Sequence, residues 1–163
     1  MKVEKIMTVE VKFCTENDNL NRAAQLMWEN DCGCIPVCAL NGGAKLIGLL
    51  TDRDICMGAY TQGKPLAEIP VTTAMARKII SCRPGDDVRQ AEALMKHNQV
   101  RRLPVTDEKG VLVGIVSIND LALEAEREAT AKVRAPELPE SEVAETLATI
   151  CEHRGREIAA QAA

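Results

Sequence analysis

Aromatic side chains are almost missing from this chain of 163 residues, which contains one Trp, one Tyr and one Phe. Hydrophobic residues still make up 46% of the sequence, so a core must be built from aliphatic residues, Met and Cys. Long apolar runs are also missing, because none approaches the roughly 18 residues that span a bilayer. The first five residues include charges and lack the apolar core of a signal peptide. We therefore expect a soluble, cytoplasmic protein that makes no membrane contact.

An excess of positive charge is absent as well, since the net charge is −4 with 27% charged residues. This balance argues against non-specific binding of nucleic acid. The sequence contains no Walker-type Gly-rich loop, no complete set of metal ligands, and no evident trio of nucleophile, base and orienting group. We therefore expect no catalysis and no required cofactor.

Cysteine is the one reactive residue type that is plentiful. Seven cysteines in a chain without an export signal are expected to be reduced thiols. Cys32, Cys34 and Cys38 would face one side of a strand, which leaves a metal or redox sensor as an alternative. Zinc sites usually pair cysteines around a turn, however, and a second pair is missing while His97 and His153 are distant in sequence. Packing in the core is therefore the favoured interpretation.

The sequence contains an internal repeat, which is the main guide to its organisation. The halves align with a shift of 68 residues before a hairpin-like turn at 41–43 and of 66 residues after it. Identical residues stand at the matched positions: Met7 and Met75, Cys14 and Cys82, Pro36 and Pro104, Gly48 and Gly114, Asp54 and Asp120. Two homologous halves follow from this alignment.

Each half is predicted to have the order β-α-β-β-α, and the fold class is therefore α+β. Asp18 and Asp86 are expected to cap the first helices, and Thr51 and Ser117 the closing helices. Apolar residues recur with a helical period between the first and second strands of each half. The predicted strands are 11–13, 34–38 and 45–50 in the first half, and 78–80, 102–106 and 111–116 in the second.

The predicted domain boundaries follow the repeat. Residues 1–62 form the first repeat, 63–71 the connection, and 72–134 the second repeat. Residues 135–163 form a Pro-broken linker and a C-terminal amphipathic helix, which Ser141 is expected to cap. Its apolar residues are expected to dock it on the module or on a partner: Val143, Leu147, Ile150 and Cys151.

A seven-residue motif occurs once in each half, as GLLTDRD at 48–54 and as GIVSIND at 114–120. Each copy has glycine, two apolar residues, a hydroxyl residue, two variable positions and an aspartate. A helix that begins after the hydroxyl residue presents free N–H groups, which favour an anion such as phosphate. A carboxylate one turn later can accept hydrogen bonds from a ribose diol. The motif therefore indicates a nucleotide site.

Capping alone explains a single copy of such a motif, because Ser or Thr followed by an acidic residue is common at helix N-termini. The occurrence of two copies in register within a matching repeat favours a binding role instead.

The paired halves resemble the tandem cystathionine-β-synthase (CBS) domain pair, also called a Bateman module, over roughly residues 1–128. The most specific likenesses are the strands IPV at 35–37 and LPV at 103–105, together with the two motifs. The resemblance implies two repeats related by a pseudo-two-fold axis, with ligands in the clefts between them. It implies adenosine ligands, which are AMP, ADP or ATP, with NAD and S-adenosylmethionine as alternatives.

The resemblance also implies roles for residues at matching positions. Asp54 and Asp120 would hold ribose hydroxyls, and Thr51 and Ser117 would meet a phosphate. The remaining candidates would line the adenine pockets or reach phosphate: Lys12, Phe13, Ile35, Pro36, Arg53, Ile80, Arg102, Leu103, Pro104 and Asn119. We expect the second site to bind phosphate better, because Arg101 and Arg102 stand where the first half has Gly33 and Cys34.

The resemblance implies a homodimer that signals to a separate, unidentified effector protein. A different interpretation is a structural adaptor whose clefts hold no ligand.

Overall fold

The computed structural model describes residues 1–40 and 43–152 of the chain. Contacts divide these residues into two compact units. We call Thr8–Pro84 with Pro104–Gly114 the sheet unit. The helix unit consists of Met1–Met7, Gly85–Leu103 and the described residues from Ile115 onward. Each unit contains residues of both sequence repeats, so the boundary between the repeats does not coincide with the boundary between the compact units.

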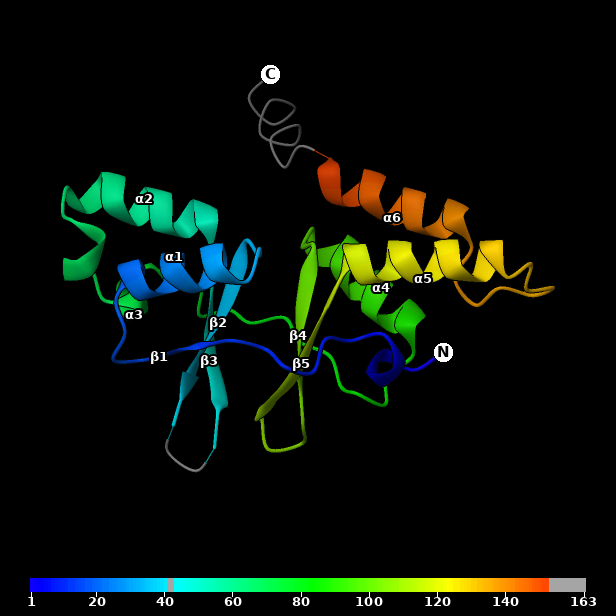
Figure 1. The fold of residues 1–163 in the computed structure, drawn as a ribbon, viewed down its shortest axis with the longest axis horizontal. Coiled ribbons are helices and arrows are strands. Elements are labelled where there is room, and N and C mark those ends of the chain that lie inside the picture. Colours follow the sequence, from blue (N-terminus) through cyan, green and yellow to red (C-terminus); the bar gives the residue numbers. More distant parts are fainter. Residues whose placement is uncertain (41–42, 153–163) are drawn as a thin grey trace, which may run out of the picture. The chain divides into compact units, whose positions relative to one another are not determined.

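The sheet unit is built on three strands in the order β1-β2-β3 (Figure 1). Strand β1 (Cys14–Thr15) is parallel to β2 (Cys34–Ala39), which pairs antiparallel with β3 (Lys45–Thr51). Both faces of β2 are buried, as expected for the central strand. The predicted hairpin turn falls mainly on Asn41 and Gly42, which lie outside the described residues.

The first strand of each half lies later in the chain than the sequence analysis placed it. Residues 11–13 and 78–80 are not in strands. The parallel pairing is formed instead by Cys14, opposite Val37, and by Cys82, opposite Val105. Both cysteines are buried, and they lie beside the central strand of their half. The β-branched and aromatic residues at 11–13 and 78–80 suggested strands, but tertiary pairing overrode this propensity.

Helices α1 (Leu20–Glu29) and α2 (Asp52–Gln62) belong to the sheet unit, with the short turns η2 (Leu66–Glu68) and α3 (Val71–Ala74). Leu20, Ala23 and Met27 of α1 are buried, as their spacing predicts. The N-cap of α1 is Asn19 rather than Asp18. The carboxylate of Asp18 instead accepts from the N–H of Thr15, at 2.7 Å, and from its hydroxyl.

The opening of the second repeat packs on the last strand of the first. Ala76 forms a bridge with Leu49 in β3, with N···O distances of 3.0 and 2.9 Å. Met75 covers Gly48, where an added Cβ would lie 2.3 Å from the Met75 sulfur. Glycine is therefore required at position 48 by close packing.

The helix unit contains α4 (Val88–Asn98), α5 (Ile118–Thr130) and α6 (Glu140–Cys151). Strands β4 (Arg102–Thr106) and β5 (Leu112–Ser117) form a two-stranded sheet, of which residues 104–106 and 112–114 belong to the sheet unit and the others to the helix unit. Asp87, not Asp86, is the N-cap of α4 and forms a capping box with Gln90. The turn η1 (Val3–Lys5) also belongs to this unit, because the Val3 N–H donates to Asp86 O at 3.0 Å.

The C-terminal helix α6 packs against α4 and α5 (Figure 1), so the prediction that it docks on the module is confirmed. Its N-cap is Pro139, and Ser141 lies inside the helix, because Pro139 already fixes the backbone where the helix begins. Val143 and Ile150 are buried as predicted, whereas Leu147 and Cys151 are exposed. Thr146 is fully buried in their place, where its hydroxyl hydrogen-bonds with Glu92.

Glu128 is a buried acidic residue on α5. It is only 5% exposed, and its carboxylate accepts from the Leu138 N–H at 2.9 Å. This hydrogen bond secures the chain that leads into α6. No described helix is long and apolar enough to cross a bilayer.

Candidate functional site

Both copies of the seven-residue motif fold as a strand that runs into a capped helix. At Thr51 the backbone N–H and the hydroxyl both donate to Asp54 Oδ2, at 2.8 and 2.7 Å. At Ser117 the same two groups donate to Asp120 Oδ2, each at 2.7 Å. Both pairs are reciprocal capping boxes. Both motifs therefore cap their helices, as the capping interpretation predicts.

Capping uses only one oxygen of each aspartate. Among the residues that the structure describes, none donates a hydrogen bond to Oδ1 of Asp54 or Asp120. Both carboxylates are partly exposed. Each aspartate thus holds its helix with one oxygen and presents the other, which can accept from a hydroxyl group.

The two helix N-termini differ in charge. At α2 the Arg53 N–H donates to Asp52 Oδ1, 2.7 Å away. At α5 the position of Asp52 is taken by Ile118, which is buried, and no described residue accepts from the Asn119 N–H. An anion would meet a carboxylate at the first motif and an unpaired N–H at the second. The N-terminus of α5 is therefore electrostatically more favourable to an anion than the N-terminus of α2.

Five of the other predicted pocket residues lie on the strands beside the motifs, and the remaining ones lie outside strands: Ile35 and Pro36 are on β2, and Arg102, Leu103 and Pro104 are on β4. Cys34 pairs with Thr51, and Ile35 with Leu50. Ile35 is 1% and Leu103 0% exposed, so both contribute to the core. The rest occupy varied environments: Pro36 and Pro104 are buried, Phe13, Ile80 and Arg102 are half-buried, and Lys12, Arg53 and Asn119 are exposed.

The cysteines have environments of different kinds. None of the seven, all of which lie in the described ranges, forms a disulfide. Burial raises the pKa of the Cys38 thiol to about 11, and Glu16 adds to the shift. Burial likewise raises the pKa of Cys14 to about 11. A protonated thiol is a poor nucleophile and a poor metal ligand, and no cluster of metal-ligating side chains occurs within residues 1–40 and 43–152.

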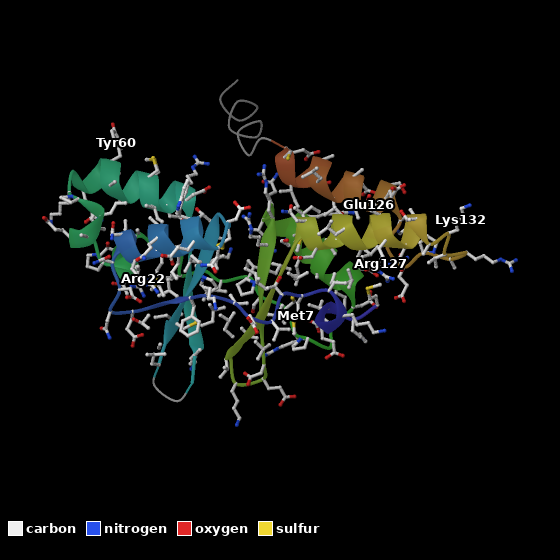
Figure 2. The ribbon with its side chains drawn as sticks, viewed as in Figure 1. Met7, Arg22, Tyr60, Glu126, Arg127 and Lys132 are labelled. Carbon is white, nitrogen blue, oxygen red and sulfur yellow. The ribbon has the colours of Figure 1, made fainter. Side chains whose placement is uncertain are left out.

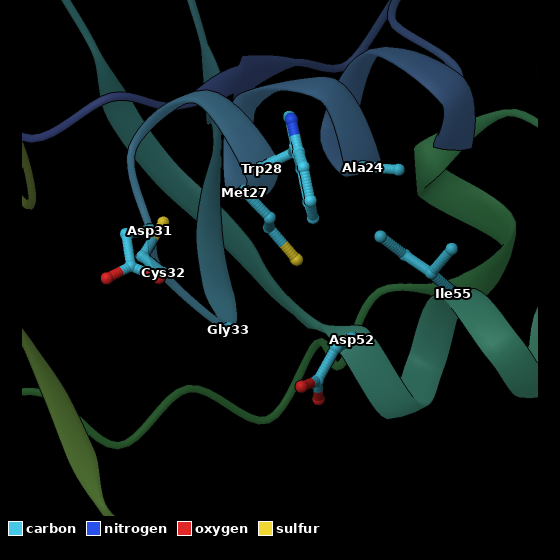
Figure 3. Close-up of a pocket in the computed structure, with 8 residues that line it drawn as sticks. All are labelled: Ala24, Met27, Trp28, Asp31, Cys32, Gly33, Asp52 and Ile55. Carbon is cyan, nitrogen blue, oxygen red and sulfur yellow. The ribbon is translucent and has the colours of Figure 1, made fainter.

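A hollow of about 430 Å³ lies between α1 and the start of α2, and the sequence analysis did not foresee it. Figure 3 shows Met27 and Ile55 turned toward one another across it, with the Trp28 ring alongside. Asp31 and Asp52 bring carboxylates to its edge. Trp28 is 89% exposed. The sequence did contain a signal for this hollow, because Trp28, the only tryptophan in the sequence, directly follows the core residue Met27.

Comparison with known proteins agrees with this architecture. The family model of the CBS domain matches the chain twice, over residues 3–58 and 67–126. The CBS domain-containing protein YhcV of Bacillus subtilis is 38% identical over 121 residues, which cover 74% of this chain and 83% of YhcV.

Two solved structures show the same fold. A conserved CBS domain protein of Thermoplasma acidophilum has a TM-score of 0.71 at 27% identity, and covers 91% of this chain and 75% of its own. The CBS domain pair of protein MJ0100, in complex with 5′-methylthioadenosine and S-adenosyl-L-methionine, has a TM-score of 0.67 at 24% identity, and covers 76% of this chain and 98% of its own. On these matches and on the repeated motif, the chain belongs to the CBS domain family and carries two copies of the domain.

Proposed function

We propose that this protein binds adenosine-containing small molecules and reports their presence to a separate effector protein in the cytoplasm. The proposed ligands are AMP, ADP and ATP, with NAD and S-adenosylmethionine as further members of the class. The proposal describes a regulatory binding protein that acts as a homodimer, without catalysis. The observation that carries it is the pair of aspartates, each with one oxygen committed to its capping box and one oxygen unpaired.

The difference between the two helix N-termini supports a division of the proposed ligands between the two motifs. The Ser117–Asp120 motif, with the unpaired Asn119 N–H, is proposed for the phosphate-bearing ligand. Asp52 beside the Thr51–Asp54 motif disfavours an anion and suits an adenosine compound that is neutral or positive near the ribose. The CBS domain pair of MJ0100, which resembles this chain in fold, binds two adenosine compounds that carry no phosphate.

Calorimetric titration with AMP, ATP and S-adenosylmethionine tests the proposal. Replacing Asp120 by Asn keeps one oxygen for the capping box but replaces the unpaired oxygen with a donor. A hydrogen bond to a charged group contributes about 1.5–3 kcal/mol, so AMP binding should weaken by roughly tenfold or more. Asp54→Asn is the matched control and should leave AMP affinity at the second motif unchanged.

A thermal-shift panel supplies an independent measurement. A ligand at 100 times its dissociation constant stabilises the folded state by about 2.7 kcal/mol. No shift with any adenosine compound, in protein shown to be free of bound nucleotide, would contradict the proposal and favour the structural adaptor.

A further inference from the structure

Helix α6 is docked on α4 and α5 through a face that is polar at its centre. It lies alongside α5, with side chains of both helices between them (Figure 2). The buried residues of this face recur at helical spacing and are Val143, Thr146 and Ile150. Thr146, in the middle, meets Glu92 of α4, which is only 2% exposed. The matching position in the first repeat, 68 residues earlier, is Ala24, so only the covered helix pair has a carboxyl group there.

The hydroxyl of Thr146 has two oxygen atoms within hydrogen-bonding distance but only one proton to donate. The carbonyl oxygen of Glu142 lies 2.9 Å from it, and Oε1 of Glu92 lies 3.2 Å from it. Because a carbonyl group has no proton, the two contacts can both be hydrogen bonds only if Glu92 donates one. A protonated Glu92 that donates to Thr146, which in turn donates to Glu142, satisfies both distances.

The other oxygen of the Glu92 carboxyl group is buried as well. Oε2 has no hydrogen-bond partner among the described residues. An ionised carboxylate would leave charge on this oxygen without a donor, which is far more costly than burying a neutral carbonyl oxygen. Both oxygens of Glu92 therefore favour the protonated form while α6 is in place.

The charged groups that act on Glu92 come from α4 and α6. Burial raises the pKa of Glu92 above its ordinary value, and Glu142 on α6 raises it further, whereas Lys96 and Arg89 on α4 oppose the shift. Both cations already meet carboxylates of α6, at 3.2 and 3.9 Å. Helix α5, which also packs on α6, contributes no such charge among the described residues. The local charges thus agree with the hydrogen bonds.

We propose that α6 is a proton-controlled cover of α4 and α5, which is docked while Glu92 is protonated and is loosened when Glu92 ionises. Release of α6 returns the carboxyl group to water, where its affinity for a proton is ordinary. The docked state therefore binds the proton more tightly than the released state. Docking is strongest at low pH and weakens as the pH rises through the docked-state pKa. The proposal is independent of the proposed ligands.

Hydrogen exchange of the α6 amides, followed by mass spectrometry from about pH 4.5 to neutral pH, tests the proposal. The wild-type protein is compared with Glu92→Gln, whose side chain stays neutral and can donate to Thr146 as the protonated acid does. The ratio of the two exchange rates at each pH cancels the pH dependence of chemical exchange. We expect this ratio to rise at least about threefold toward neutral pH. A ratio that does not change with pH would overturn the proposal.

Reference amides and further variants assign the effect to α6. The amides of β2 report global unfolding, and at neutral pH they should stay at least about tenfold better protected than those of α6. Equal protection would overturn the proposal, because α6 would then open only when the whole protein unfolds. Glu92→Ala, which introduces the residue of the first repeat, should also remove the pH dependence. Glu145→Gln, which alters an exposed carboxylate of α6, is the matched control and should retain it.

Discussion

Both repeats contain the same pair of helices, but only the pair in the second repeat is covered by a further described helix. On α4 and α5 the surface is covered by α6, and the polar residues Glu92, Lys96 and Gln99 all have partners there. On α1 and α2 the matching surface is open around Trp28, which is 89% exposed. A few substitutions on a repeated scaffold therefore separate a surface that the chain itself covers from one that no described residue covers.

The same contrast occurs at the ligand motifs. The capping boxes match within 0.1 Å in their two shortest hydrogen bonds, so the backbone scaffold is duplicated. Asp52 and Ile118 occupy matching positions, yet one brings charge to a helix N-terminus and the other is buried. Specificity can thus diverge at a single position while the fold stays constant.

Truncating Leu138, which helps to hold α6 on the second repeat, should have the largest effect on stability. Leu138 is fully buried and its N–H is held by Glu128. We expect Leu138→Ala to lower the free energy of unfolding by about 2–4 kcal/mol, because truncation leaves a cavity. Urea denaturation measures the change. Leu147→Ala on α6, at a position that is 44% exposed, is the control and should cost less than about 0.5 kcal/mol.

Filling the close contact at Gly48 should have the next largest effect, this time in the first repeat. Gly48→Ala forces the Met75 side chain to move and should cost about 1–3 kcal/mol, as overpacking does. Thermal denaturation measures the loss, and Gly85→Ala, where a Cβ meets nothing within 4 Å, serves as the control. Adding Met75→Ala to Gly48→Ala should cost less than the sum of the two single changes. Full additivity would disprove the contact.

We expect part of the pH dependence of folding stability to arise in the second repeat, whose helices α4 and α5 are covered by α6. Burial raises the pKa of Glu92 above its ordinary value of 4.5, and Glu142 raises it further, while Thr146, Lys96 and Arg89 oppose the shift. A raised folded-state pKa means that the native state binds the proton more tightly. The stability that this provides is complete at low pH and is lost as the pH rises through the folded-state pKa.

Glu92→Gln keeps the side chain neutral and should therefore raise stability near pH 7 by about 1 kcal/mol. It should also flatten the decline in stability as the pH rises from the ordinary glutamate pKa of 4.5 toward neutral pH. Denaturation series across that range measure both effects. Glu126→Gln, at an exposed position of α5, should leave the profile unchanged. An unchanged profile in Glu92→Gln would show that this carboxylate is not the titrating group.

Exchanging the central residues of the two surfaces should have the smallest effect on stability. Trp28→Lys should change the free energy of unfolding by less than about 0.5 kcal/mol, because the ring is exposed. Lys96→Trp removes the ion pair with Glu145 and should cost about 0.5–1 kcal/mol. Chemical denaturation compares the two. A larger loss in Trp28→Lys would show that the ring is already covered in solution.

The sequence was sufficient at the repeated seven-residue motif and at the central strand of the second repeat. The two motifs, their caps at Thr51 and Ser117 and the strand 102–106 were predicted in their observed places, because spacing and capping are local properties. The first strands at 11–13 and 78–80 were wrong, because two-residue parallel pairing depends on a distant neighbour. The ligand-binding role of the motifs stays a prediction.

The features that differ between the repeats were harder to foresee. The burial of Glu128 depends on the Leu138 N–H, which arrives from the segment before α6. The hollow beside Trp28 depends on two helices that are separate in sequence. Local propensity and periodicity do not reveal contacts between segments that are distant in sequence. The repeat alignment does show which positions of the two halves to compare.

The place of Met75 has a consequence for the history of this protein. The opening of the second copy fills the space over Gly48 of the first copy and pairs Ala76 with Leu49. Residues 1–7 in turn lie in the helix unit, beside Asp86. Each copy has thus become part of the framework of the other, so an evolutionary loss of either one would remove structure from the survivor.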